Sequence, residues 1–357
     1  MESTYLVPYE KLVELGKKIF MTTGLNSEDA QILCESLVRA DMKGIKSHGM
    51  VRVPDYMLLL EKGIVDAKAK TEVVKETPVS LVLDAGNAMG SVASHKACVM
   101  TRNKAKKVGL AYTVVFNSNH NGAGGYWSNM LAGEDMIGFA ASDAIPVVAP
   151  PNGIGRGIGS NPFSYSFPAQ RHPNFCLDIS VGCMAQGKIW EYKRLNKPLP
   201  ENFWIGPDGE MTTDPNQFDI NEYIMMPFGG HKGFGLGIAY EAMTSLLAGR
   251  AFPAEFKGFT KEMERISHCF FAIDISIFTD LDGYRKRASD YFDYIHALPV
   301  KPGAPSVMIP GEPEAILEKQ SLKEGVRIAT QIVDNMTCIA KEQGIDLSEF
   351  IFTKTDN

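Results

Sequence analysis

The sequence predicts a mixed α/β protein with more than one domain. Its 357 residues exceed what one ordinary hydrophobic core holds, which favours two or three domains. Near both ends of the chain, apolar residues recur at intervals of three and four positions, as they do in amphipathic helices. Between these ends lie short β-branched and apolar runs, such as residues 110–116, which are typical of strands.

The composition is that of a globular protein. Hydrophobic residues make up 45% of the chain and charged residues 22%, and the formal net charge is -6. Lysines and arginines are scattered without a basic patch, so we expect no nucleic-acid partner. The N-terminus lacks the basic start and apolar run of a secretory signal, and no stretch is apolar enough for a membrane span. We therefore predict a cytoplasmic protein with no membrane contact.

The cysteines and histidines do not have the spacings of disulfide frameworks or metal sites. The six cysteines are dispersed and include no C-x-x-C pair, which argues against disulfides and a structural zinc site. No two of the seven histidines have the H-x-x-x-H spacing of a helical metal site. We therefore predict no metal.

Three helices are expected at the start of the chain. Residues 8–21 carry apolar side chains with helical spacing. Asn26, which is followed by acids, is a typical N-cap of a second helix, whose apolar face includes positions within 30–40. A proline lies near the first turn of a third helix at 54–62.

The stretch 46–56, K-S-H-G-M-V-R-V-P-D-Y, follows the second of these helices and runs into the third. Ser47, His48 and Arg52 supply a hydroxyl, an imidazole and a permanent cation within six positions. Arginine can bind the carboxylate of an oxo acid bidentately, and histidine can exchange a proton with the oxygen on the carbon next to that carboxylate. The stretch therefore suits an oxo acid. The alternative is an ordinary turn, because serine and glycine are common in turns.

The next stretch with chemical content follows a buried strand. Strands are expected at 71–75, 79–84 and 110–116, with a helix at 94–108. The last strand leads into N-S-N-H-N-G-A-G-G-Y-W, where His120 precedes glycines that let a ligand approach the backbone. The alternative is a loop histidine that bonds only to the backbone.

Residues 136–141, 163–168 and 175–180 are also expected to be strands. The glycines of the intervening loop 149–162 do not match the G-x-G-x-x-G pattern of a Rossmann fold. The backbone N–H groups of this loop could bind a phosphate or a nicotinamide, and a bare surface loop is the alternative. Asp178 lies at a strand end, where its carboxylate could orient an imidazole; the alternative is a capping or turn-forming residue.

The glycine-rich stretch 227–237 opens another helix. Glycines at a helix start leave N–H donors open to an anion, and Lys232 adds a positive charge there. Close helix packing explains the later glycines without a ligand, but it does not explain Lys232. The stretch lacks the Walker pattern, so a nucleoside triphosphatase is not indicated.

The end of the chain combines strands and helices. Ser321 and Glu324 have the spacing of a capping box for a helix that runs to Gln343. Val326 to Ala340 would supply its apolar stripe. Before this helix we expect a strand at 270–278, a helix at 280–294 and a strand-to-helix junction at 307–314.

Together these motifs resemble the type-2 malate/L-lactate dehydrogenase family, which also includes ureidoglycolate, sulfolactate and diketogulonate dehydrogenases and a cyclic imine reductase. The resemblance covers most of the chain, and five motifs in one order are more specific than any one alone. The motifs are Ser47-His48-Gly49 with Arg52 and Tyr56, residues 117–120 with the following glycines, residues 159–162, Leu177-Asp178 with Gly187-Lys188, and residues 229–236.

The resemblance implies a non-Rossmann fold of the α+β type. A mainly antiparallel cofactor domain would be inserted between segments of a helical domain and a linking domain, and two chains would form a homodimer. The ranges would be 1–75 plus 313–357 for the helical domain, 76–117 plus 281–312 for the linking domain and 118–280 for the cofactor domain.

The resemblance also implies hydride transfer between NAD or NADP and C2 of a 2-hydroxy or 2-oxo acid such as malate, lactate or ureidoglycolate. His48 would be the proton donor or acceptor, Asp178 its orienting partner, and His120 a second polar group over the nicotinamide or substrate. Substrate contacts would come from Ser47, Arg52 and Tyr56, and cofactor contacts from His120, Ser142, Asp178, Ser180, His231, Lys232, Gly233, Gly311 and Glu312.

The chain departs from the family's usual residues at three places. Asn121 stands where an aromatic residue is common, residues 141–143 are Ala-Ser-Asp instead of Thr-Asn-Ser, and residues 180–184 replace Ala-Thr-Ser. Substrate identity and the choice between NAD and NADP therefore stay open. Two alternatives also stay open: a reductase of a cyclic imino acid, which needs the same carboxylate clamp and acid, and a non-catalytic cofactor-binding homologue.

Overall fold

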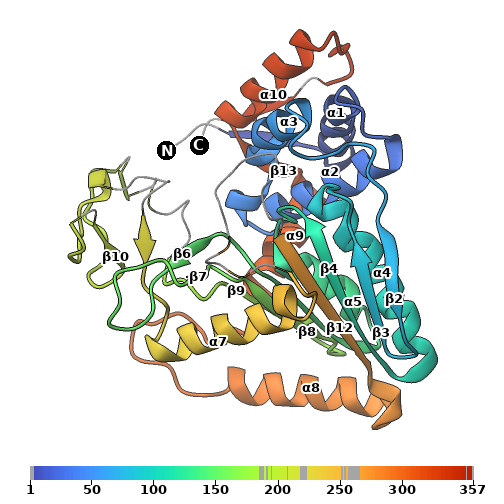
Figure 1. The fold of residues 1–357 in the computed structure, drawn as a ribbon, viewed down its shortest axis with the longest axis vertical. Helices are drawn as coiled ribbons and strands as arrows, with labels where there is room; N and C mark the ends of the chain where they lie inside the picture. Colours follow the sequence, from blue (N-terminus) through green and yellow to red (C-terminus); the bar gives the residue numbers. More distant parts are fainter. Residues whose placement is uncertain are drawn as a thin grey trace.

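The structure, a computed structural model, describes residues 4–184, 189, 192–193, 195–206, 208–217, 223–250, 252, 255, 266–350 and 352–355. Within these ranges the strands form sheets of three, four and seven strands, and helices pack around them (Figure 1). The mixed α/β class predicted from the sequence is confirmed.

The seven-stranded sheet is the centre of the molecule. Its strands lie in the order β2-β3-β4-β12-β5-β8-β9. Only β3 and β4 pair in parallel, and every other neighbouring pair is antiparallel. The strands are β2 (Glu72–Glu76), β3 (Ser80–Asp84), β4 (Leu110–Ser118), β12 (Ile266–Asp274), β5 (Met136–Ser142), β8 (Phe163–Phe167) and β9 (Phe175–Ile179).

Each face of this sheet packs against its own hydrophobic core. On one face, α4 (Gly90–Val108) and α5 (Gly124–Ala132) pack through residues such as Trp127 and Phe270. On the other, Tyr240 at the end of α7 (His231–Glu241) joins a core shared with the four-stranded sheet. A π turn, Ala242–Leu246, continues α7. The small sheet contains β10 (Trp204–Ile205), β11 (Ile224–Met225), β6 (Pro146–Val148) and β7 (Ile158–Gly159).

A helical layer covers one end of the molecule (Figure 1). Its helices share one core, in which Leu12, Met50 and Tyr56 are buried. Asn26 caps its second helix as predicted, because its side chain accepts from the N–H groups of Glu28 and Asp29. The layer contains α1 (Tyr9–Met21), α2 (Ser27–Met42), α3 (Val53–Glu61), α10 (Thr330–Glu342) and the sheet β13-β1-β14 (Val326–Ala329, Thr4–Val7 and Thr353–Thr355).

The predicted capping box of Ser321 and Glu324 is wrong. These residues end helix α9 (Glu312–Glu324) instead of starting a helix. Gly325 follows with a φ of 101°, a left-handed conformation that ends the helix. Val326 then pairs with Val7 as part of β13. Helical spacing of the apolar residues hid this strand, because four residues are too few to show a strand period.

Two further expectations differ from the structure. The strand expected at 270–278 is β12, which ends at Asp274, whose carboxylate caps a 3-10 turn at Ile275–Ile277. No strand is assigned within the described residues 307–314, where α9 begins directly after a loop. The helix expected at 280–294 is α8 (Leu281–His296), which lies at the opposite end of the molecule from α10 (Figure 1).

The division into three domains stays a prediction. Its boundary after residue 117 falls inside β4, one residue before that strand ends. The large sheet combines strands from both sides of this boundary. Among the described residues, no helix combines the length and apolar character needed to cross a bilayer.

Candidate active site

A buried carboxylate holds the loop that carries Ser47 and His48. Asp41, in the last turn of α2, accepts a hydrogen bond of 2.7 Å from the Met50 N–H through Oδ2. Its Oδ1 lies 3.6 Å from the Lys46 ammonium. A Cβ atom on Gly49 would lie 2.3 Å from the Asp41 carboxyl group, so only glycine fits. Burial raises the pKa of Asp41 to about 6. No sequence motif pointed to this residue.

The loop places the three predicted groups together. The Ser47 hydroxyl lies 2.9 Å from Nδ1 of His48. The Arg52 Nε donates to the Ser47 carbonyl at 2.7 Å, and its Nη1 lies 3.2 Å from Asp55. The loop is therefore closed on itself by Arg52, whose remaining Nη2 donors have no hydrogen bond among the described residues.

His120 comes from another part of the chain and stacks on His48. The two ring centroids are 5.4 Å apart, with an angle of 21° between the planes. The buried Tyr56 hydroxyl on α3 lies 2.5 Å from Nδ1 of His120. In each ring Nδ1 bonds to a hydroxyl, and within the described part of the chain Nε2 of each ring has no partner. Whether Tyr56 also contacts substrate stays a prediction.

Both imidazoles are neutral near pH 7. Burial, assisted by the positive charge of Arg52, lowers the pKa of His48 to about 4. Burial also lowers the pKa of His120 well below its ordinary value, and His48, Arg52 and His268 add to this shift. Burial raises the pKa of Tyr56, so its hydroxyl keeps its proton and can donate to His120.

His268, which the sequence analysis did not single out, connects three strands behind His120. His268 lies near the start of β12, and its Nδ1 is 2.9 Å from the Ser142 hydroxyl. Its Nε2 lies 3.0 Å from the Ser118 hydroxyl and 3.1 Å from the Asn119 carbonyl, next to His120. Ser142, predicted to contact the cofactor, is thus buried and bonded to His268. The bridging role of His268 becomes visible only once the strands are paired, because a histidine within an apolar strand carries no signal of its own.

Asp178 is on β9, and its carboxylate lies at the start of α5. Its Oδ2 accepts a hydrogen bond of 2.7 Å from the Gly125 N–H, and a Cβ on Gly124 would lie 3.1 Å from its Oδ1. Burial raises the pKa of Asp178 to about 6. No hydrogen bond or ion pair joins Asp178 to His48 in the described residues, so its orienting role stays a prediction. The bond to the Gly125 N–H matches the capping alternative, a carboxylate at a helix start.

The start of α7 carries an exposed cation. Lys232 is exposed and has no ion-pair partner among the described residues, and His231 beside it is also exposed. The N–H of Gly233 donates to Phe228 and that of Phe234 to Gly230, so the expected row of open N–H donors is largely used within the turn. Ser180 bonds only weakly, at 3.5 Å, to Gly182. Gly187 and Lys188 lie outside the described residues.

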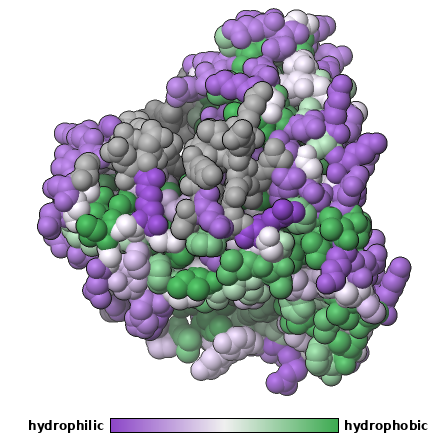
Figure 2. Space-filling view, viewed as in Figure 1, coloured by the Kyte–Doolittle hydropathy of each residue, from purple (hydrophilic) through white to green (hydrophobic). Residues whose placement is uncertain are grey.

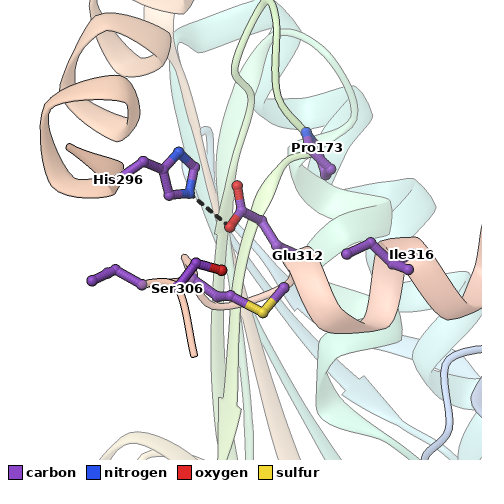
Figure 3. A pocket seen from close by; sticks show the side chains of 7 residues that line it. Pro173, His296, Ser306, Glu312 and Ile316 are labelled. Atoms are coloured by element: carbon purple, nitrogen blue, oxygen red, sulfur yellow. Dashed lines mark hydrogen bonds and ion pairs between the residues drawn. The ribbon is translucent and has the colours of Figure 1, made fainter. Parts of the chain in front are cut away.

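Gly311 and Glu312 open α9 beside β9. Gly311 has a φ of 97°, and a Cβ there would lie 2.9 Å from the Cys176 nitrogen. The Glu312 carboxylate is bonded to Nε2 of His296 at 2.9 Å (Figure 3), and its other oxygen lies 3.7 Å from Nδ1 of His172. These two histidines hold the Glu312 carboxylate. A contact of Glu312 with a cofactor stays a prediction.

The comparisons with known proteins agree with one family. A family model described as malate/L-lactate dehydrogenase matches residues 7–337. The chain belongs to the malate/L-lactate dehydrogenase family. The malate dehydrogenase of Pyrococcus horikoshii is 30% identical over 352 residues, 97% of each chain, and the L-sulfolactate dehydrogenase of Methanocaldococcus jannaschii is 33% identical, covering 92% of this chain and 94% of that one.

A solved structure of this family has the same fold. The sulfolactate dehydrogenase from Methanocaldococcus jannaschii superposes with a TM-score of 0.88 at 30% identity, covering 96% of this chain and 99% of that one. The predictions of the family and of an oxidoreductase are confirmed. A dehydrogenase of this family uses a nicotinamide cofactor, and the residues here fit one in chemistry. Among the residues that the structure describes, Lys232 has no ion-pair partner and can offer its ammonium to a phosphate, and Nε2 of each neutral imidazole has no hydrogen bond.

Proposed function

We propose that this dehydrogenase transfers a hydride between a nicotinamide and C2 of a 2-hydroxy or 2-oxo acid, with His48 as proton donor and acceptor. The stacked pair of His48 and His120 carries this proposal. In both rings Nε2 has no partner within the described ranges, and Arg52 lies near enough to lower the pKa of each. Two neutral imidazoles beside a permanent cation suit a carbonyl oxygen next to a carboxylate.

A bound nicotinamide would accept or donate the hydride, and the chain accepts the proton during oxidation and donates it during reduction. When a hydroxy acid is oxidised, the lone pair on Nε2 of His48 takes the hydroxyl proton while Nδ1–H donates to Ser47. When an oxo acid is reduced, the same Nε2 returns the proton to the oxygen on C2. His120, held by Tyr56 at Nδ1, donates through Nε2–H to that oxygen.

Arg52 and Ser47 hold the carboxylate of the substrate. Nη2 of Arg52 has no hydrogen bond to any described residue, and its Nη1 contacts the exposed Asp55, so the guanidinium can bind a carboxylate. A bound carboxylate also counters the effect of Arg52 on His48. Binding therefore raises the pKa of His48 toward the range in which it carries a proton.

We propose that NAD or NADP lies along the residues that the sequence assigns to it. They are His120, Ser142, Asp178, Ser180, His231, Lys232, Gly233, Gly311 and Glu312. The exposed Lys232 at the start of α7 supports this proposal, because its ammonium can pair with a phosphate of the cofactor.

Absorbance of the reduced nicotinamide tests the function directly. Each cofactor is combined with oxaloacetate, 3-sulfopyruvate and pyruvate, the first two chosen from the names of the relatives, and with a cyclic imino acid. We expect turnover of a 2-oxo acid with at least one cofactor. Turnover of the imino acid alone would replace the proposal with C=N reduction. Calorimetric cofactor binding without any turnover would indicate a non-catalytic homologue.

We also propose a homodimer, supported by an apolar surface along α7. Figure 2 shows apolar side chains gathered where α7 lies, and Leu236, Ile238, Leu246 and Leu247 are exposed there. Exposed apolar patches mark contact surfaces. Sedimentation should show a dimer that Leu246→Glu weakens. Ile154→Glu, at an exposed apolar residue elsewhere, should leave the dimer intact.

A further inference from the structure

His172, His296 and Glu312 converge on one point, although they come from three separate segments. Each offers one ligand atom, and these atoms all lie within 4.8 Å of one another. His172 precedes β9, His296 ends α8 and Glu312 begins α9. Sequence spacing could not show this cluster, because its members are 124 (172 to 296) and 16 (296 to 312) positions apart.

The distances suit a shared ion. Two donor atoms on one tetrahedral zinc ion are roughly 3.4 Å apart, given bond lengths near 2.1 Å. Nδ1 of His172 lies 3.7 Å from one Glu312 oxygen, which is too long for a hydrogen bond. Nε2 of His296 lies 2.9 Å from the other oxygen. Small side-chain movements would therefore place all three donors around one ion.

Carboxylates and backbone orient the three donors. Nε2 of His172 bonds to Asp293 at 2.7 Å, which leaves Nδ1 directed toward Glu312. This carboxylate–histidine arrangement is typical of metal ligands. The Ile309 N–H donates to Glu312 at 2.8 Å and fixes its carboxylate. The aromatic ring of His172 also packs against Phe292, with centroids 5.8 Å apart.

A pocket borders the cluster. Its volume is about 370 Å³, and His296 and Glu312 form part of its wall (Figure 3). Ser306, Met308 and Ile316 line the rest, together with Pro173 and Val307. This space allows a water molecule or a small ligand to reach a fourth coordination position.

We propose that His172, His296 and Glu312 bind one divalent transition-metal ion of the zinc class. Two imidazoles and a carboxylate are a common ligand set for zinc, and the pocket leaves the fourth position open. The ion connects the end of α8, the start of α9 and the segment before β9. It stabilises this junction and takes no part in the proton transfer at His48.

Calorimetric titration of the full chain with zinc chloride tests the site. The exposed Cys338 is replaced in every protein by Cys338→Ser, so that a surface thiol does not bind zinc. We expect one ion per chain, visible ligand-field absorption of a tetrahedral site with cobalt(II), and a melting temperature that rises with metal concentration. His296→Ala should remove the absorption and the thermal shift.

A matched pair of variants keeps the test decisive if removal of a ligand disturbs folding. Asp293→Asn removes the carboxylate that orients His172, and we expect roughly ten- to hundredfold weaker binding. Asp290→Asn removes the same charge beside the same Arg171 without touching His172, and should bind as the parent does. No saturable binding in the parent, or equal affinity in Asp293→Asn and Asp290→Asn, would overturn the proposal.

Discussion

Two pairs of histidines in this molecule have nearly equal separations but opposite surroundings. The ring centroids of His48 and His120 are 5.4 Å apart, and those of His172 and His296 are 5.3 Å apart. The first pair bonds to hydroxyls and lies near the cation Arg52. The second pair bonds to carboxylates.

The difference shows how neighbours assign a task to an imidazole. Burial and a nearby cation oppose protonation, so the first pair stays neutral and exchanges a proton with a substrate whose carboxylate counters that cation. Carboxylates concentrate negative charge around the second pair, which favours a bound cation. The same residue type therefore serves proton transfer at one place and, in our proposal, metal binding at another.

The largest effect should come from His48→Ala. Loss of the proton-transferring group should lower kcat by about a hundredfold or more, while zinc affinity at the second pair stays unchanged. His95→Ala, at a half-buried histidine on α4 outside both pairs, is the control in steady-state assays. A kcat within a few-fold of the parent would show that His48 is not the proton-transferring group.

Gly49→Ala should disturb the first pair through its support. The added Cβ would lie 2.3 Å from the Asp41 carboxyl group, and such overpacking costs about 1–3 kcal/mol. Denaturant unfolding should show this loss together with a reduced kcat. Gly155→Ala, where the added Cβ meets no atom within 4 Å, should be close to neutral. Equal stability of the two variants would contradict the role of Asp41.

Tyr56→Phe should have a smaller effect on the same pair. It removes the hydrogen bond to Nδ1 of His120 at 2.5 Å, which we expect to cost about 1 kcal/mol of stability. The tautomer of His120 is then no longer set, so kcat should fall by less than in His48→Ala. If Tyr56→Phe has the same kcat and the same free energy of unfolding as the parent, Tyr56 has no role in the site.

The pH dependence of the parent enzyme gives the subtlest test. The pKa of His48 is lowered to about 4, so its basic form is present above that pH. For oxidation, kcat/KM should therefore fall only as pH drops through about 4. For reduction, which needs the protonated form, kcat/KM should fall as pH rises above about 4. The lowered pKa would be contradicted if the pH profile of kcat/KM changed slope near the ordinary value of 6.5 and this change were absent from His48→Ala.

Local features of the fold were predictable, because they depend on residues close in sequence. The helical spacing in 8–21 and the N-cap at Asn26 both match the structure. So do the strand at 110–116, as part of β4, and the end of that strand just before His120. The wrong prediction of a capping box at Ser321 also comes from reliance on local sequence, since a capping pattern can occur by chance at the end of a helix.

Supporting residues were not predictable, because their roles depend on what the fold brings next to them. Asp41 looks like any acid near a helix end until Gly49 and Met50 pack against it. His268 gains its role from partners on two neighbouring strands. The bond from the Gly125 N–H to Asp178 likewise depends on how β9 packs against the start of α5.

The sequence by itself determined the family, the helices and strands with strong spacing, and the short motif that joins Ser47, His48 and Arg52, since each is encoded by residues that are near neighbours or occur in a specific order. Only the tertiary structure decided that His120 stacks on His48 and that His172, His296 and Glu312 meet. Contacts between distant segments depend on how sheets and helices pack, and sequence spacing carries no measure of that packing.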